Sequence, residues 1–376
     1  MRIKIFTDLR FTGLATPTGV TKHIHRMVRG LAAERSNEVS VLAARDQVDA
    51  KCQIPATNML AGMPATVVPW SWKAAEASWT VFGQPFADDW CGDTDWVYCP
   101  KNDFIPLRKV RVAVTVHGAA GLDPAMRRSL APRTVFNRWR THTAYRRMLD
   151  QAAVVLTVSE FLKTQVIDWF GVDPRRICVV GNGVEEEYFS AADLPRGLSG
   201  EPGDSPFVLA VGGLNHLDGG DRILALAKLM RQRLPDFRIL VAGCQHEERL
   251  GKQATELPNV RLLGYQKSER LALYMRDAMA LVFPTRYETF GIAAAEAMAV
   301  GTPVITCPST AVPEVVGDAG IYANPDEPDS ILAALLELQT RSELRDLLVE
   351  RGRERSRAHT WSACVSRLQQ ALAAAR

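Results

Sequence analysis

Short apolar runs rich in β-branched residues alternate with longer segments of helical periodicity along the whole chain. This alternation is typical of βαβ units, in which helices cover a sheet of parallel strands. The first half contains seven such runs, at residues 3–7, 39–43, 65–69, 96–99, 112–117, 154–158 and 177–180. The second half contains six, at residues 207–211, 238–242, 260–263, 280–283, 303–307 and 320–322. The pattern therefore predicts an α/β protein with two doubly wound sheets.

The chain is expected to divide into two domains. At 376 residues it is longer than a single hydrophobic core usually supports. The stretch AADLPRGLSGEPGDS is rich in glycine, proline and serine, which predicts a linker. We expect an N-terminal domain, a linker, a C-terminal domain and a final amphipathic helix that packs back on the N-terminal domain, at residues 1–190, 191–205, 206–357 and 358–376.

Composition and charge narrow the class of protein. Hydrophobic residues make up 47% and charged residues 23% of the chain, as in ordinary folded proteins. The net charge of +3 is too small to indicate nucleic-acid binding by bulk electrostatics. The longest apolar runs are shorter than the roughly 20 residues that span a bilayer, and the N-terminal residues lack the apolar stretch of a signal peptide. We therefore expect a cytoplasmic protein without a nucleic-acid partner.

No metal site or disulfide framework is evident in the sequence. The seven cysteines are scattered and include no Cys-x-x-Cys pair. They are expected to be small core residues. His23 and His25 have no third partner at the spacing of metal ligands.

Two carboxylates flank the start of a short predicted helix in the second half. This helix is expected to begin near Gly291 and to end at Gly301, with Pro303 beyond it. A helix N-terminus offers unpaired backbone N–H groups and the positive end of a dipole, which suit a phosphate. Glu288 precedes this terminus, and Glu296 lies about 6 to 8 Å further along at 1.5 Å per residue. Hydroxyls of a sugar and a ribose on either side of a diphosphate would face these carboxylates, which indicates a nucleotide sugar.

The context of this pair is similar to that of a known family. The Glu-x7-Glu spacing lies in YETFGIAAAEAMAVGTPVI and is followed by VPEVVGDAG at residues 312–320. These motifs closely resemble the retaining glycosyltransferases of family 4 (glycosyl transferases group 1), which have the GT-B architecture of two Rossmann-like domains facing a cleft. The resemblance covers most of the chain, is weakest at residues 45–95, and extends through VAVTVHG, VVLTVSEF, VGNGVEEEYF, FVLAVGGL and NVRLLGY.

The resemblance implies a role for individual residues. Glu288 would hold the donor sugar together with the backbone of Thr289, Phe290 and Gly291. Ile292 would offer its N–H to phosphate, and Glu296 would hold the ribose. His117 matches a histidine that contacts the donor sugar, so the resemblance implies a catalytic role for His117 and Glu288. The other donor-binding candidates are Gly19, Asn182, Gly212, Gly213 and Arg286. The alternative is a structural role for these residues. Glu288 and Glu296 would be solvated carboxylates at a helix start, His117 would be a histidine with satisfied hydrogen bonds at a strand end, and Asn182 would lie in a plain turn.

The chain departs from the family pattern where the diphosphate should bind. Members usually carry an arginine and a lysine after the first strand of the second domain, and the matching positions here are Gly213 and Asp218. A hydrogen bond to a charged group contributes roughly 1.5 to 3 kcal/mol, so losing two would cost about two to four decades in affinity. Either other cations replace them or the protein is no longer catalytic. We hypothesise that Arg286 replaces them, with Arg222 as the second candidate.

The resemblance implies transfer of a sugar, with retention and without a metal or cofactor, from a nucleotide-diphosphate sugar to a glycan or lipid-linked acceptor. Such a reaction would serve the synthesis of a bacterial surface polysaccharide. Two alternatives stay open. One is another GT-B nucleotide-sugar enzyme, such as an epimerase. The other is a silent relative that binds a nucleotide sugar or acts as a scaffold.

One local stretch is strongly basic. Residues 127–147 contain seven arginines and no acidic residue, with Phe136, Trp139 and Tyr145 among them. Such a stretch is typical of a peripheral surface that contacts anionic lipid, here at the inner membrane face. The alternative is a solvated helical face.

Overall fold

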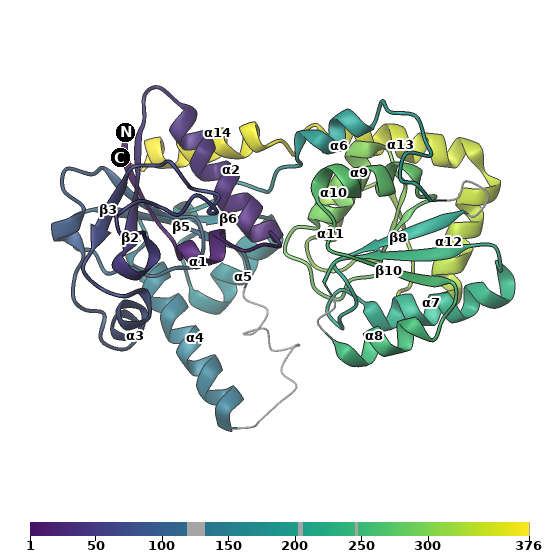
Figure 1. Cartoon of the computed structure of the whole chain (residues 1–376), viewed down its shortest axis with the longest axis horizontal. Helices are drawn as coiled ribbons and strands as arrows, with labels where there is room; N and C mark the ends of the chain where they lie inside the picture. Colours follow the sequence, from purple (N-terminus) through teal and green to yellow (C-terminus); the bar gives the residue numbers. More distant parts are fainter. Residues whose placement is uncertain (119–131, 202–205, 245–246, 376) are drawn as a thin grey trace. The chain divides into compact units, whose positions relative to one another are not determined.

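The computed structural model describes residues 1–118, 132–201, 206–244 and 247–375. The chain folds into two compact units (Figure 1). The first consists of Met1–Gly181 and Trp361–Arg376, and the second of Asn182–Thr360. Each unit is built from a parallel sheet and packed helices, and each is described by itself below.

The described part of the first unit contains a seven-stranded parallel sheet in the order β3-β2-β1-β4-β5-β6-β7. The strands are β1 (Arg2–Phe6), β2 (Glu38–Ala44), β3 (Ala65–Val68), β4 (Trp96–Cys99), β5 (Arg111–Val116), β6 (Val154–Thr157) and β7 (Ile177–Val179). The order reverses between β1 and β4, and in such sheets ligands bind where the order reverses. The longer helices are α2 (Gly19–Ala33), α3 (Trp72–Phe82), α4 (Pro132–Gln151), α5 (Glu160–Phe170) and α14 (Trp361–Ala374).

The C-terminal helix α14 belongs to the first unit, where it packs against α2. Val365 and Leu368 of α14 join the core that contains Ile24 and Met27 of α2. Gly30 permits this close approach, because a Cβ atom at this position would lie 2.4 Å from Cγ2 of Val365. The last helix therefore returns to the first half of the chain.

The described part of the second unit contains a six-stranded parallel sheet in the order β10-β9-β8-β11-β12-β13. The strands are β8 (Phe207–Val211), β9 (Arg238–Ala242), β10 (Val260–Gly264), β11 (Leu281–Phe283), β12 (Val304–Thr306) and β13 (Gly320–Tyr322). Here the order reverses between β8 and β11. The helices are α6 (Glu186–Ala191), α7 (Gly220–Arg233), α8 (Glu248–Thr255), α9 (Ser268–Asp277), α10 (Ile292–Val300), α11 (Val312–Val316), α12 (Pro328–Thr340) and α13 (Ser342–Ser356). Figure 1 shows α7 and α8 on one face of this sheet and α9 and α10 on the other.

The division of the chain differs from the predicted one at the linker. The boundary between the units falls at Gly181, so the second unit begins before residue 191. The described part of the predicted linker is tied to the second unit, because the Asp277 carboxylate accepts the N–H groups of Gly197 and Ser199, each at 2.7 Å. Residues 202–205 lie outside the described residues. Glycine, proline and serine content predicted a linker but could not show these side-chain anchors.

The cysteines agree only in part with the expected core role. Cys91, Cys99, Cys307 and Cys364 are buried, whereas Cys52 is exposed. Among the helices that the structure describes, none is both long and apolar enough to cross a bilayer.

Candidate active site

The predicted helix start with its two carboxylates is present in the second unit. The loop after β11 ends at Gly291, whose φ of +95° lies in the left-handed region, and α10 runs from Ile292 to Val300 with Gly301 as its C-cap. This confirms the helix predicted between Gly291 and Gly301. Because Ala293 to Val300 are all buried, α10 is a central element that holds its N-terminus in a fixed place.

The Glu288 carboxylate interacts with the turn that follows it. Its Oε1 accepts hydrogen bonds from the N–H groups of Thr289 at 2.9 Å and Phe290 at 3.3 Å. Burial raises the pKa of Glu288, and the nearby charge of Asp218 raises it further, although the backbone N–H groups oppose this shift. The structure thus brings Glu288, Thr289, Phe290 and Gly291 together in one turn at the start of α10. Their roles toward a sugar stay predictions.

Glu296 is only 3% exposed and lies inside α10, four residues after Ile292. Helix α10 packs against α6, which carries Tyr188. Burial raises the pKa of Tyr188, and the charge of Glu296 raises it further, so the hydroxyl and the carboxylate are close enough to interact. The predicted contact of Glu296 with a ribose stays a prediction, as does the contact of the Ile292 N–H with phosphate.

A residue that the motifs did not single out, Thr310, holds the backbone of Glu288. The Thr310 hydroxyl donates to the Glu288 carbonyl at 2.6 Å and accepts the Glu288 N–H at 2.8 Å. Thr310 has a φ of +50°, which is unusual for a β-branched residue. Nothing in the sequence around Thr310 signals this conformation, because it depends on the contact with a loop more than twenty residues earlier.

The glycine turn after β8 explains why no arginine stands at position 213. A Cβ atom on Gly213 would lie 2.1 Å from the carbonyl oxygen of Cys244, and its φ is +81°. The N–H groups of Gly212 and Gly213 both donate to the carbonyl of Ala242 at 3.0 Å. A Cβ atom on Gly212 would lie 2.8 Å from Oδ2 of Asp218, so the Asp218 carboxylate covers this turn. A side chain at Gly213 cannot fit this backbone.

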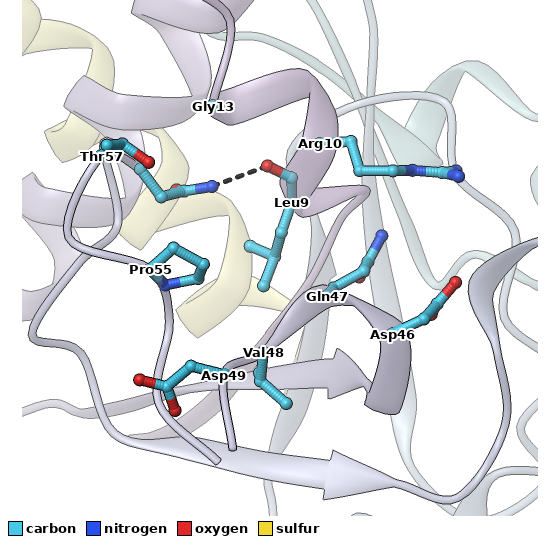
Figure 2. A pocket seen from close by; sticks show the side chains of 10 residues that line it. Leu9, Arg10, Gly13, Asp46, Gln47, Val48, Asp49, Pro55 and Thr57 are labelled. Carbon is cyan, nitrogen blue, oxygen red and sulfur yellow. Dashed lines mark hydrogen bonds between the residues drawn. The ribbon is translucent and has the colours of Figure 1, made fainter. Parts of the chain in front are cut away.

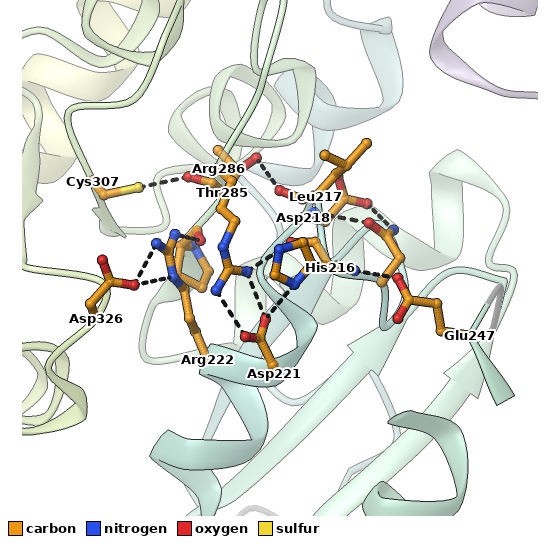
Figure 3. A network of polar contacts seen from close by, with 12 residues as sticks. His216, Leu217, Asp218, Asp221, Arg222, Glu247, Thr285, Arg286, Cys307 and Asp326 are labelled. Atoms are coloured by element: carbon orange, nitrogen blue, oxygen red, sulfur yellow. Dashed lines mark hydrogen bonds and ion pairs between the residues drawn. The ribbon is translucent and has the colours of Figure 1, made fainter. Parts of the chain in front are cut away.

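The two arginines expected to replace the missing cations are both paired with aspartates (Figure 3). Arg286 is 19% exposed and binds Asp221 through two hydrogen bonds of 2.6 and 2.8 Å, and its Nη1 also donates to the His216 carbonyl. Arg222 is 11% exposed and binds Asp326 at 2.7 Å and the Pro284 carbonyl at 2.9 Å. The structure therefore places Arg286 beside the loop after β8, but with its charge compensated by Asp221.

Three sequence candidates, His117, Gly19 and Asn182, lie away from the α10 turn along the chain. His117 follows β5 in the first unit; its Nε2 lies 2.9 Å from the Pro100 carbonyl oxygen. Burial lowers the pKa of His117 to about 4, so the ring is neutral at pH 7. Gly19 is the first residue of α2, and Asn182 is a buried residue at the start of the second unit. The structure does not test their predicted contacts with a donor.

A cavity in the first unit was not signalled by any motif (Figure 2). It has a volume of about 290 Å³ and lies between the segments that follow β1 and β2. Its lining includes Arg10, Asp46, Gln47, Asp49 and Asn58. Oδ1 of Asp46 accepts the Trp72 N–H at 2.8 Å, and Oδ1 of Asp49 accepts the Lys51 N–H at 2.8 Å. Backbone contacts thus fix both carboxylates at the rim of the cavity.

The described residues contain no group of three or more histidine, cysteine, aspartate or glutamate side chains placed to hold a metal ion. The predicted absence of a metal and of a cofactor stays a prediction.

Two doubly wound units with parallel sheets define the GT-B class of α/β proteins. Sucrose-phosphate synthase from Thermosynechococcus elongatus has the same fold, with a TM-score of 0.73, 19% identity and coverage of 98% of this chain and 97% of that chain. The Anabaena protein HepE in complex with UDP-glucose aligns over 100% of both chains with a TM-score of 0.70 and 15% identity. At these identities the likeness shows the fold alone.

Sequence comparison then gives the family. Residues 17–188 match Glycosyltransferase Family 4, and residues 196–355 match Glycosyl transferases group 1. The chain is 27% identical over 284 residues to the O-antigen chain mannosyltransferase B of Escherichia coli, which covers 72% of each chain. It spans about half the length of other curated relatives, such as the D-inositol 3-phosphate glycosyltransferase of Thermomonospora curvata, to which it is 31% identical over 227 residues. The chain belongs to the group 1 glycosyltransferases of the GT-B fold.

Proposed function

We propose that this protein transfers a sugar from a nucleotide-diphosphate sugar to a glycan or lipid-linked acceptor, with retention of configuration and without a metal, in the synthesis of a surface polysaccharide. One observation carries the donor site: the half-buried Glu288 carboxylate lies at the N-terminus of the central helix α10 and accepts the N–H groups of the turn there. A mannosyltransferase of O-antigen chains among the relatives and a UDP-glucose complex among proteins of the same fold support this donor and acceptor class.

The chemistry of such a transfer suits the N-terminus of α10. The bond between the anomeric carbon and the diphosphate breaks while the acceptor hydroxyl forms a new bond on the same face, and its proton passes to the leaving phosphate. The main task of the protein is to stabilise charge on that phosphate. Backbone N–H groups and the helix dipole at Ile292 supply fixed positive potential for this purpose. Glu288 orients the sugar hydroxyls, and Glu296 binds the ribose.

Arg286 supplies the cation for the diphosphate in this proposal. Its side chain lies beside the loop after β8, where the diphosphate would be flanked by Asp218. Because Asp221 neutralises Arg286 in the structure, the donor phosphate competes with Asp221 for the guanidinium. We expect Arg286→Gln to weaken donor binding about 10- to 100-fold, as for loss of a charged hydrogen bond. Unchanged donor affinity in Arg286→Gln and Arg222→Gln would exclude both arginines.

The cavity in the first unit is our candidate for the acceptor. Carboxylates that are already fixed by backbone N–H groups can accept hydrogen bonds from sugar hydroxyls with their remaining oxygens. Asp46→Asn and Asp49→Asn should raise the acceptor KM and leave donor affinity unchanged, because the amide oxygen still accepts the backbone bonds. Asp89→Asn, an exposed residue of the same unit, is the matched control. Equal effects of all three changes would contradict this assignment.

Contact with an anionic membrane is proposed through the described part of the basic stretch. On α4, Trp139 is 61% exposed, whereas Tyr145 is buried and Arg147 donates to the carbonyls of Trp79 and Val81. Arg127 and Arg128 lie outside the described residues. Phe82, at the end of α3, is 74% exposed. Flotation with anionic vesicles should depend on Trp139 and Phe82. Equal flotation with anionic and uncharged vesicles would exclude the proposal.

Measurable transfer of a sugar to an acceptor distinguishes this function from the two alternatives, an epimerase and a silent relative. We expect wild-type protein to move sugar from a nucleotide sugar to an added glycan acceptor. Glu288→Gln should lose at least about 100-fold in kcat, because in this proposal its carboxylate faces the reacting sugar. A GT-B epimerase would convert the donor without an acceptor. A silent relative would bind the donor and produce neither product.

A further inference from the structure

Side chains of the segment after β12 hold the loop that carries Arg286 and Glu288. Strands β11 and β12 pair in register, with Phe283 opposite Thr306. Beyond these strands the next segment contains Pro308, which has no N–H to donate. Thr306, at the end of β12, and three residues around Pro308 donate from their side chains to four carbonyls of residues 283–288. These bonds join Thr306 to Phe283 at 2.8 Å, Cys307 to Thr285 at 3.0 Å, Ser309 to Arg286 at 2.7 Å and Thr310 to Glu288 at 2.6 Å.

Thr310 ends this series and differs from its other members. Its hydroxyl both donates to the Glu288 carbonyl and accepts the Glu288 N–H at 2.8 Å, so one side chain satisfies both backbone polar groups of Glu288. The Ala311 N–H adds a third bond, to the Glu288 carbonyl at 3.2 Å. The backbone of Glu288 is therefore fixed from one side while its carboxylate turns toward Thr289 and Phe290.

The backbone conformation of Thr310 is the second observation. A φ of +50° is unfavourable for a β-branched residue, and unfavourable conformations persist where the surrounding contacts over-determine them. A glycine would adopt this φ without strain but has no hydroxyl. Thr310 thus combines an unfavourable backbone conformation with two hydrogen bonds to a single residue, Glu288.

We propose that Thr310 is a positioning residue, whose hydroxyl holds the Glu288 carboxylate in the geometry that receives the donor sugar. This role rests on the proposed function, because it concerns the residue that orients the sugar. Preorganisation of this kind affects the reaction more than binding of the nucleotide, because only the sugar lies against Glu288 in the proposed complex.

The test compares three variants of Thr310. Thr310→Val keeps the shape and removes the hydroxyl, Thr310→Ser keeps the hydroxyl, and Thr310→Gly keeps the backbone conformation without strain. We expect Thr310→Val and Thr310→Gly to lower kcat/KM for the nucleotide sugar by about 10- to 100-fold and to change the Kd of the free nucleotide by less than about threefold. Thr310→Ser should restore kcat/KM to within about threefold of wild type.

Thr302→Val is the matched control. The Thr302 hydroxyl likewise donates to a backbone carbonyl, that of Met275 at 2.6 Å, but it is buried and its bond lies outside the Glu288 loop. This variant should leave kcat/KM unchanged. Full activity of Thr310→Val, or an equal loss in Thr302→Val, would overturn the proposed role.

Hydrogen exchange gives a readout that does not require activity. The Glu288 amide donates to Thr310, so its exchange should accelerate by at least about tenfold in Thr310→Val and Thr310→Gly but not in Thr310→Ser. If wild-type protein transfers no sugar, the proposed function fails, while the exchange rates still decide whether Thr310 holds Glu288. Unchanged exchange in Thr310→Val would overturn the role even in an active enzyme.

Discussion

At the scale of single residues, protonation states follow from burial. His117 is held near the Pro100 carbonyl and its pKa is lowered to about 4, first by burial and also by the charge of Lys101, which outweigh the hydrogen bond to Pro100. Glu288 shows the opposite direction, because burial raises the pKa of a carboxyl group. Both groups are therefore shifted toward their neutral forms. For His117 this means that the ring carries no positive charge at neutral pH.

The pH dependence of stability tests the state of His117. Its folded-state pKa lies below the usual 6.5, so the unfolded chain binds the proton more tightly. The contribution of neutral His117 to the free energy of unfolding is complete above pH 6.5. It is lost as the pH falls from 6.5 toward 4, by an amount on the order of 3 kcal/mol. The thermal midpoint of wild type should fall more steeply over this range than that of His117→Asn. Parallel slopes for wild type and His117→Asn would contradict the shift.

The sequence identified some of these residues and not others for a physical reason. Glu288 and Glu296 lie on one short segment, so their spacing along a helix start was visible in the sequence. The pairing of Arg286 with Asp221 and the bond between Thr310 and Glu288 join segments far apart in the chain. Such contacts depend on how strands are ordered in the sheet, which residue patterns do not encode locally.

At the scale of elements, glycines set the shape of the candidate donor site. Gly291 has a φ of +95°, yet a Cβ atom there would have an ordinary contact of 3.7 Å with the Glu288 side chain. Gly213 has both a positive φ and a contact of 2.1 Å with the Cys244 carbonyl. Position 291 therefore needs glycine only because of its positive φ. Position 213 needs glycine because of its positive φ and because a Cβ atom would overlap the Cys244 carbonyl.

Alanine substitutions should separate these two causes. Gly291→Ala is expected to lower the free energy of unfolding by about 1 to 2 kcal/mol, the usual penalty for a left-handed conformation. Gly213→Ala should lower the free energy of unfolding more, because the backbone of Cys244, just after β9, must also move. Thermal melts of both variants provide the comparison, with Gly251→Ala on α8 as a control where a Cβ meets nothing within 4 Å. If Gly213→Ala were the milder change, or if Gly213→Arg folded and bound donor more tightly, the account of this turn would be wrong.

Element boundaries were predictable where hydrophobic pattern and turn residues agree. Each strand expected from a short β-branched run is present in the described residues, including the three-residue β11 and β12, with ends that differ from the expected ones by at most one residue. The linker was less predictable. Gly197 and Gly200 flank a turn and both have a positive φ. Glu201 is 9% exposed and pairs with Arg238 and Arg261 at 3.0 and 2.8 Å, which ties the described part of the segment to the second unit.

At the scale of the whole molecule, the two units have separate hydrophobic cores. One core contains α2 and α14 with the sheet of the first unit, and another contains the sheet of the second unit with α7 and α12. The cavity with Asp46 and Asp49 belongs to the first unit, and the turn with Glu288 belongs to the second. This division matches the proposed separation of acceptor and donor, and it lets donor binding be measured without an acceptor.

The most direct measurement is calorimetric titration of the protein with UDP, GDP, dTDP and ADP and their common sugars. We expect one nucleotide series to bind and to raise the thermal midpoint by mass action. Glu296→Gln should abolish this binding, whereas Glu288→Gln should still bind the free nucleotide and lose only the added affinity of the sugar. Absence of binding by every nucleotide, or binding that Glu296→Gln leaves intact, would contradict a donor site at the N-terminus of α10.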